Sequence, residues 1–94
     1  MFSTEVPRNA VRKLVPTGTA EPIVSGSLKS TDYVRVCADS ENTVAIYISD
    51  LSVNVTDSIP LYAKDVVTYE GLSDASLLYC ITDTAGQYLR IEVR

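Results

Sequence analysis

Apolar and polar residues alternate along much of residues 33–94, which is the two-residue period of a β-strand with one buried face. Residues 33–38 and residues 43–49 each follow this period, and the polar residues 39–42 between them are typical of a tight turn. We therefore predict two strands joined as a hairpin. The apolar faces of these strands consist of Val34, Val36, Ala38, Val44, Ile46 and Ile48.

The last part of the chain predicts a second hairpin. Residues 76–82 are apolar on both faces, which indicates a central strand, and residues 88–93 alternate between an apolar and a polar face. The five-residue connection 83–87 suits a turn in which Gly86 supplies a positive φ. The buried positions of the final strand are predicted to be Leu89, Ile91 and Val93.

Shorter apolar runs lie between these two predicted hairpins. Residues 53–55, 59–61 and 66–69 are predicted as short strands, and Pro60 restricts the second of them to a sheet edge or a strand entry. Residues 72–78 could turn once at most, and we expect no long helix. The predicted fold class is all-β, as a small antiparallel β-sandwich or a jelly-roll-like barrel.

The first 26 residues have a different pattern from the rest. They contain Pro7, Pro16 and Pro22 and show little sustained alternation, although residues 11–15 and 23–24 could each add an edge strand. A segment with so little apolar surface to bury does not offset the entropy of ordering it. We therefore predict that residues 1–26 form an extended N-terminal arm, poorly ordered in the isolated chain. A β-sandwich domain is predicted for residues 27–94.

Composition narrows the class of protein further. The length of 94 residues and the hydrophobic content of 46% predict one folded domain. The net charge is −4 and the sequence has no dense stripe of basic residues, so we expect no nucleic-acid partner. No apolar run approaches the ~20 residues of a membrane span, and the first residues lack the apolar core of a signal peptide. We expect folding in a cytoplasm and no membrane partner. Cys37 and Cys80 match no metal-site spacing and are predicted to be reduced thiols.

Candidate catalytic chemistry is sparse. The chain has no histidine, which removes Ser-His-Asp and Cys-His catalysis and most zinc sites. The stretch Asp83-Thr84-Ala85-Gly86 resembles the Asp-Thr-Gly motif of dimeric aspartic proteases only in part, because Ala85 interrupts it. Aspartate is common at the start of such turns, so the presence of Asp83 is explained without a catalytic role. Residues 39–42 could hold calcium weakly, but a solvated turn is the preferred reading. We predict no enzyme activity, no metal site and no cofactor.

The residues best suited to bind a partner are two tyrosines and three cations. Tyr47 and Tyr88 lie opposite the apolar faces of their predicted strands, which would expose them, and tyrosine is common in protein interfaces. Arg8, Arg12 and Lys13 are three of the eight basic residues and fall in the predicted arm, where they could pair with acidic groups on a neighbouring surface.

The order of features over residues 31–94 resembles that of small β-sandwich virion proteins of tailed bacteriophages, of the capsid decoration (cement) or head-fibre-base type. Ser58 and Cys80 stand where glycine and alanine are common in those proteins, and "YAKD" replaces their usual glycine-containing turn. The matching segments are Val44-Ala45-Ile46-Tyr47-Ile48, Ile59-Pro60-Leu61, Leu78-Tyr79-Cys80-Ile81 and Leu89-Arg90-Ile91.

This resemblance implies a non-enzymatic structural protein that binds the outer surface of a phage capsid. Its partners would be the major capsid protein or other virion proteins, it would form a homo-oligomer, with a trimer favoured, and it would be found in the virion after assembly in the host cytoplasm. The alternative is a sugar- or host-surface-binding β-module of a phage tail or fibre. Such a module is expected to gather several tyrosines on one concave face.

Overall fold

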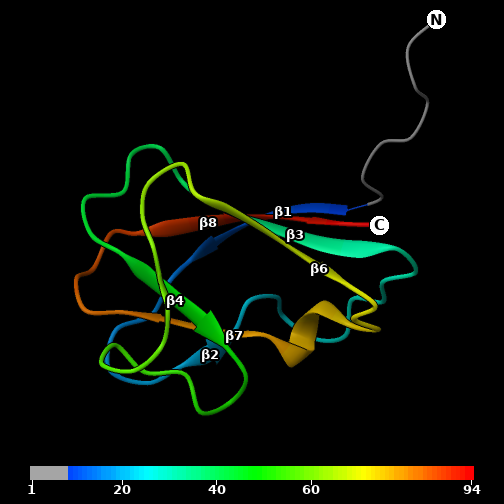
Figure 1. Cartoon of the computed structure of the whole chain (residues 1–94), viewed down its shortest axis with the longest axis horizontal. Coiled ribbons are helices and arrows are strands. Elements are labelled where there is room, and N and C mark those ends of the chain that lie inside the picture. Colours follow the sequence, from blue (N-terminus) through cyan, green and yellow to red (C-terminus); the bar gives the residue numbers. More distant parts are fainter. Residues whose placement is uncertain (1–8) are drawn as a thin grey trace, which may run out of the picture.

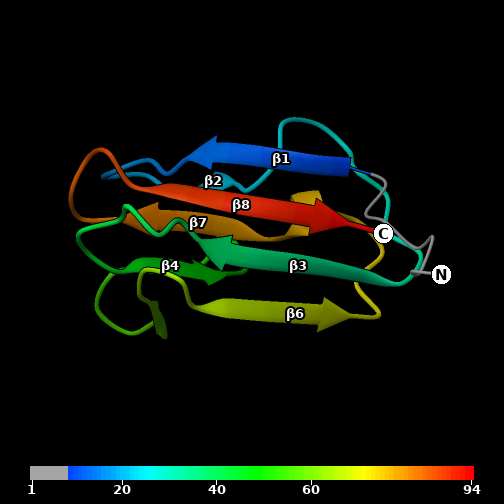
Figure 2. The same cartoon turned by 90° about the horizontal axis from the view of Figure 1, so that it is seen from above.

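Eight strands form two stacked antiparallel sheets in the computed structural model, which describes residues 9–94 (Figures 1 and 2). Sheet A has the order β1-β8-β3-β6 and sheet B has the order β2-β7-β4-β5. The predicted all-β sandwich is therefore confirmed. The elements are β1 (Asn9–Leu14), β2 (Glu21–Pro22), β3 (Tyr33–Ala38), β4 (Ile46–Ser49), β5 (Pro60–Leu61), β6 (Val66–Glu70), the 3₁₀ turn η1 (Ala75–Leu77), β7 (Tyr79–Thr82) and β8 (Tyr88–Val93).

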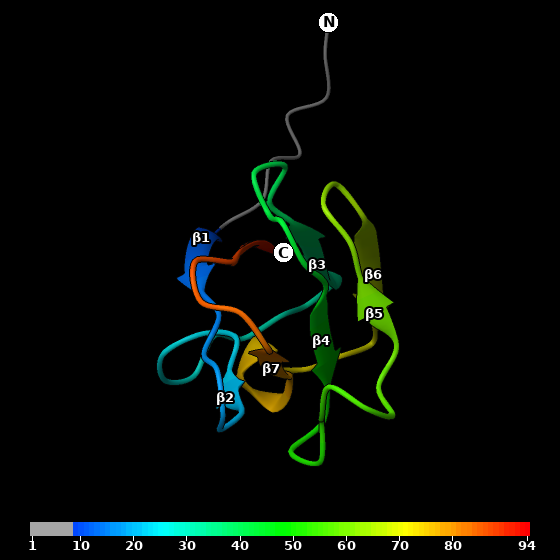
Figure 3. The same cartoon turned by 90° about the vertical axis from the view of Figure 1, so that its left-hand side faces the viewer.

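The core lies between the two sheets, as the end-on view in Figure 3 shows. Every second residue of β3 and β8 points into it, because successive side chains of a strand face opposite sides. Full burial of one aliphatic side chain contributes about 1.5–3 kcal/mol relative to leaving it in water. Of the predicted apolar positions only Val44 is half-buried, since it precedes β4. The others are buried: Val34, Val36, Ala38, Ile46, Ile48, Leu89, Ile91 and Val93.

Both predicted hairpins are wrong in their pairing, although the strands exist. β3 pairs with β6 and β8, whereas β4 pairs with β5 and β7 in the other sheet. In the same way β7 pairs with β2 and β4, whereas β8 pairs with β1 and β3. Each connection therefore crosses from one sheet to the other instead of turning back within a sheet. β7 does lie inside sheet B with Cys80, Ile81 and Thr82 buried, as predicted for a central strand.

Polar side chains hold the two crossing connections together. Gln87 is buried, its Oε1 accepts from the backbone N–H of Thr43 at 2.8 Å, and its Nε2 donates to the Thr43 hydroxyl at 3.1 Å. The Asn42 side chain bonds both the backbone N–H and the carbonyl of Tyr88 at 2.9 Å. These bonds satisfy backbone groups that leave the sheets at the crossing. Gly86 has φ 92°, which confirms the predicted positive φ.

Residues 9–26 belong to the sandwich, so the predicted boundary at residue 26 is wrong for this part of the chain. β1 pairs along its full length with β8, and β2 is an edge strand of sheet B. Val15, Ile23 and Val24 enter the core. The apolar residues here are few, but they fill the sheet edges instead of forming a periodic face of their own. Pro22 lies in an edge strand, where a missing N–H costs no ladder bond.

A single 3₁₀ turn, η1, precedes β7, as predicted for residues 72–78. Its N-cap is Asp74, which accepts from the backbone N–H groups of Ser76 and Leu28 at 2.9 Å and from the hydroxyl of Ser27. These hydrogen bonds stabilise the carboxylate, so they hold the pKa of Asp74 well below its usual range. Asp74 thereby connects Ser27 and Leu28, which follow β2, to the 3₁₀ turn that precedes β7.

Candidate functional site

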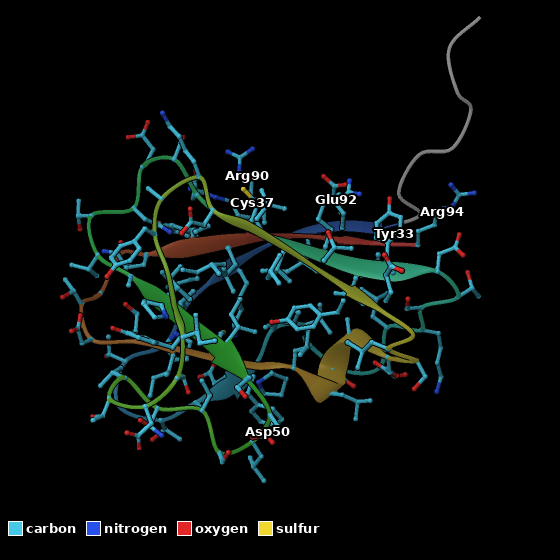
Figure 4. All side chains as sticks on the ribbon, in the orientation of Figure 1. Tyr33, Cys37, Asp50, Arg90, Glu92 and Arg94 are labelled. Carbon is cyan, nitrogen blue, oxygen red and sulfur yellow. The ribbon has the colours of Figure 1, made fainter. Side chains whose placement is uncertain are left out.

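The outward positions of sheet A collect arginine and tyrosine side chains on one face. We call this surface the arginine face (Figure 4). It arises because the inward positions of β1, β3 and β8 face the core, so the alternate positions must face solvent. The face holds each of the four arginines in the described part of the chain. Its members are Arg12, Tyr33, Arg35, Cys37, Tyr88, Arg90, Glu92 and Arg94.

One end of the arginine face is a cluster built from three elements. The guanidinium of Arg12, on β1, lies 3.8 Å from the ring centre of Tyr88 on β8. The Nη2 of Arg12 also donates to Oδ2 of Asp39, directly after β3, at 3.0 Å. Arg90 approaches the other oxygen of Asp39 at 3.7 Å. Arg12 and Arg90, from the neighbouring strands β1 and β8, therefore both contact the Asp39 carboxylate.

The Asp39 carboxylate is a buried anchor and not a solvated turn residue. Its side chain is 2% exposed, whereas the Arg12 and Arg90 side chains are 54% and 65% exposed. The hydrogen bond from Arg12 holds the pKa of Asp39 below its usual value, and the charge of Arg90 acts in the same direction against the opposing effect of burial. The prediction of a solvated turn is therefore wrong for Asp39. Its carboxylate oxygens face the guanidinium groups of Arg12 and Arg90, so they are not available to a calcium ion as the weaker alternative requires.

The other end of the arginine face carries looser contacts. The guanidinium of Arg35 lies 4.7 Å from the ring centre of Tyr33 and 3.7 Å from a carboxylate oxygen of Glu92. Arg94 Nε lies 3.6 Å from a carboxylate oxygen of Asp32. Residues 10–12 and 90–92, which include Arg12 and Arg90 of the first end, line a shallow depression of about 530 Å³. Exposed guanidinium groups therefore border this depression.

The five predicted partner-binding residues do not form one surface. Arg12 and Tyr88 come together, because β1 pairs with β8. Lys13 points to the other side of β1 and donates to Glu21 Oε1 at 2.7 Å. Tyr47 lies on the outer side of sheet B, and Arg8 lies outside the described residues. The structure thus unites one predicted cation with one predicted tyrosine and separates the others.

The outer side of sheet B has a different character. The outward positions of β4 and β7 are Tyr47, Ser49, Tyr79 and Ile81, and none of them is charged. The tyrosines of the chain are accordingly divided, since Tyr33 and Tyr88 lie on the arginine face and Tyr47 and Tyr79 on sheet B. Each sheet face therefore holds two of these four tyrosines, which is fewer than the several that the sugar-binding alternative predicts for one face.

Residues 9–94 contain no group of three His, Cys, Asp or Glu side chains that could hold a metal ion. Asp83 is exposed in the connection after β7, where its carboxylate accepts from the Thr84 hydroxyl at 3.1 Å. Cys37 and Cys80 are free thiols, as predicted, and burial raises the pKa of Cys80 to about 12. Within the described part, no helix has the length and hydropathy needed to cross a membrane.

Comparison with known proteins adds no family to this description: no protein-family model, no curated protein and no solved structure matches the chain. The class that the structure itself defines is a small antiparallel β-sandwich with one arginine-bearing face. The sequence places Arg90 and Arg94 on the polar side of the last strand, but neither they nor Arg35 were among the predicted partner-binding residues. The alternation of residues 88–94, with tyrosine, arginine, glutamate and arginine at every second position, carried that signal.

Proposed function

We propose that this protein is a non-enzymatic virion structural protein that docks on the outer surface of a phage capsid through its arginine face. The observation that carries the proposal is the gathering of four arginines and two tyrosines on one sheet face of an otherwise acidic chain. Arginine and tyrosine are the residues most enriched in the energetic centres of protein interfaces. The resemblance of residues 31–94 to phage decoration proteins supports a capsid as the partner.

The arrangement of the arginine face favours tight docking of a protein partner. The Arg12 side chain is already held by Tyr88 and Asp39, so less conformational entropy remains to be lost on binding. Arg90 and Arg12 still expose more than half of their side chains, which leaves guanidinium N–H donors for a carboxylate or carbonyl oxygen of the partner. An acidic or carbonyl-lined patch of a capsid subunit has the matching chemistry.

The division of the tyrosines between two faces weighs against the alternative of a sugar-binding module. Sugar platforms use several aromatic rings side by side, with amide or acidic neighbours. Tyr33 and Tyr88 are engaged by Arg35 and Arg12 respectively, so their rings are partly covered by guanidinium groups. The capsid-docking proposal accounts for those contacts, whereas a sugar site would need them removed.

The first test is whether a major capsid gene lies beside the gene for this chain, and the second is co-sedimentation of this chain with empty shells assembled from that capsid protein. We expect the double variant Arg35→Ala/Arg90→Ala to bind shells at least about tenfold more weakly than the parent chain, since hot-spot residues contribute more than about 1 kcal/mol each. Lys29→Ala is the matched control, because it also removes an exposed positive charge but lies outside the arginine face. Equal occupancy for all three chains would rule out docking through this face.

A further inference from the structure

The two edges of sheet A are protected to very different degrees. β1, at one edge, carries Lys13 opposite the buried Leu89 of β8, so a charged side chain points inward at the rim and pairs with Glu21 of β2. Inward-pointing charge of this kind opposes the addition of another strand, because the added strand would bury it. The edge formed by β1 is therefore guarded.

β6, at the opposite edge, lacks such protection. Its sequence, Val-Val-Thr-Tyr-Glu, contains no proline, glycine or lysine, and its only charge is Glu70 at the end. β-branched and aromatic residues in an uncharged run favour strand pairing. Val66 is 56% exposed, and β6 pairs with β3 alone among the described strands. The outer edge of β6 is therefore suited to backbone hydrogen bonding with a further strand.

The ladder between β3 and β6 determines which backbone groups of β6 are free. Ala38 donates to the carbonyl of Asp65 and accepts from the N–H of Lys64, both at 2.9 Å, so the ladder begins with a bulge at Lys64. Continuing the antiparallel alternation, Val67 and Tyr69 direct their N–H and C=O groups toward β3. The corresponding groups of Val66, Thr68 and Glu70 point away from the sheet.

We propose that β6 pairs with β6 of a second copy of this chain, antiparallel and centred on Thr68. In this register Thr68 faces Thr68 of the second copy, and Val66 faces Glu70. The outward N–H and C=O groups of all three residues then bond across the interface. On the inner side Val67 faces Tyr69. The pairing joins two copies of sheet A into one continuous sheet.

A second copy is the occupant that the charge pattern of β6 favours. A two-fold register places no like charges opposite each other, because Glu70 meets Val66 and not itself. The contact is isologous and closes at two copies, which avoids open growth along the edge. A trimer would need a different contact.

The inferred pair stands independently of capsid docking, but it would strengthen docking. Two copies of sheet A in one continuous sheet hold their arginine faces on the same side. A surface with repeated subunits could then be engaged by both copies at once, which raises the effective concentration of the second contact.

Amide hydrogen exchange, followed residue by residue by NMR at increasing protein concentration, tests this pairing. We expect exchange at Val66, Thr68 and Glu70 to slow by about tenfold or more as the pair forms. The amide of Arg12, which points outward from the guarded edge, should exchange equally fast at every concentration. Constant fast exchange at Thr68 would overturn the proposal. Protection that appears only when shells are added would instead assign the edge to a capsid strand and also overturn it.

Thr68→Pro removes an N–H that only the second copy uses, and proline is tolerated at such positions of edge strands. We expect sedimentation equilibrium to show the parent chain associating with concentration and Thr68→Pro remaining monomeric. Ala10→Pro removes an equivalent outward N–H from the β1 edge and should leave association unchanged. Thr68→Lys, which opposes two like charges at the centre, provides a second disruption if the proline variant unfolds. Association that persists in both Thr68 variants would exclude the β6 edge.

Discussion

The outer faces of the two sheets are built on the same core yet have opposite chemistry. Sheet A presents arginines with acidic partners, whereas the outward strand positions of sheet B are uncharged. The inward positions of both sheets are mostly apolar, and Lys13 at the rim of sheet A and Thr82 in sheet B are the polar exceptions. The comparison teaches that one shared core accounts for the sandwich, whereas the number of charges on sheet A exceeds what that core requires.

The largest expected effects come from the core that both faces share. Ile91→Ala removes a buried side chain of sheet A, and Ile46→Ala removes one of sheet B. Each should lower the free energy of unfolding by about 2–5 kcal/mol, because the lost burial and the cavity both count. Urea denaturation measures both values. A cost confined to one sheet would show that the two faces do not share one cooperative core.

The next effect concerns the connections that join the two faces. Gln87→Ala removes a buried amide that accepts from the backbone N–H of Thr43 and donates to the Thr43 hydroxyl. We expect the free energy of unfolding to fall by about 1–3 kcal/mol, because two hydrogen bonds that contribute about 0.5–1.5 kcal/mol each are lost. Thr84→Ala, in the exposed part of the same connection, is the control and should change stability little. Equal costs would contradict the role given to Gln87.

Acid should weaken the Asp39 contacts of the arginine face, in addition to the Asp74 cap of η1, whose pKa is also lowered. The pKa of Asp39 is lower in the folded chain than in the unfolded chain, so its stabilisation is present above the unfolded value of about 4. That stabilisation is lost as the pH falls through the lower folded value. Asp39→Asn should therefore be less stable than the parent chain near neutral pH and approach it in acid. Urea denaturation across this range checks the prediction, and a constant difference would contradict it.

The smallest effect is expected at the exposed end of the arginine face. Arg35 and Glu92 form a pair at 3.7 Å with both side chains about two-fifths exposed. A double-mutant cycle with alanine at each position should give a coupling of about 0.2–1 kcal/mol, which high salt reduces. A coupling well above this range would mean that the exposed end of the face contributes to folding as strongly as the buried Asp39 end.

The strands themselves could be predicted from the sequence, because the period of two is a local property. The choice of neighbours could not. Alternation states which face of a strand is buried, but a four- or five-residue connection fits a hairpin within one sheet as well as a crossing between two sheets. Residues 39–42 and 83–87 both cross. The buried amide of Gln87, which binds the start of the segment leading to β4, is a tertiary contact without a local signal.

The same limit applies to the candidate site. Outward positions such as Arg90 and Glu92 follow from the alternation of β8, so a face bearing them could be predicted. The contact of Arg12 with Tyr88 depends on the register of β1 against β8, which spans almost the whole chain. The local sequence predicts only a turn at Asp39, because nothing near it in the chain indicates that Arg12 and Arg90 both contact its carboxylate.

The position of β8 between β1 and β3 also sets the order of events during synthesis. β1 is made first, but its partner β8 is the last of the described strands to leave the ribosome. Sheet B likewise waits for β7, which lies between β2 and β4. Until those residues appear, the earlier strands have only part of their hydrogen-bonding partners, and contacts so distant in sequence form slowly. The nascent chain therefore cannot complete either sheet until β7 and β8 have left the ribosome.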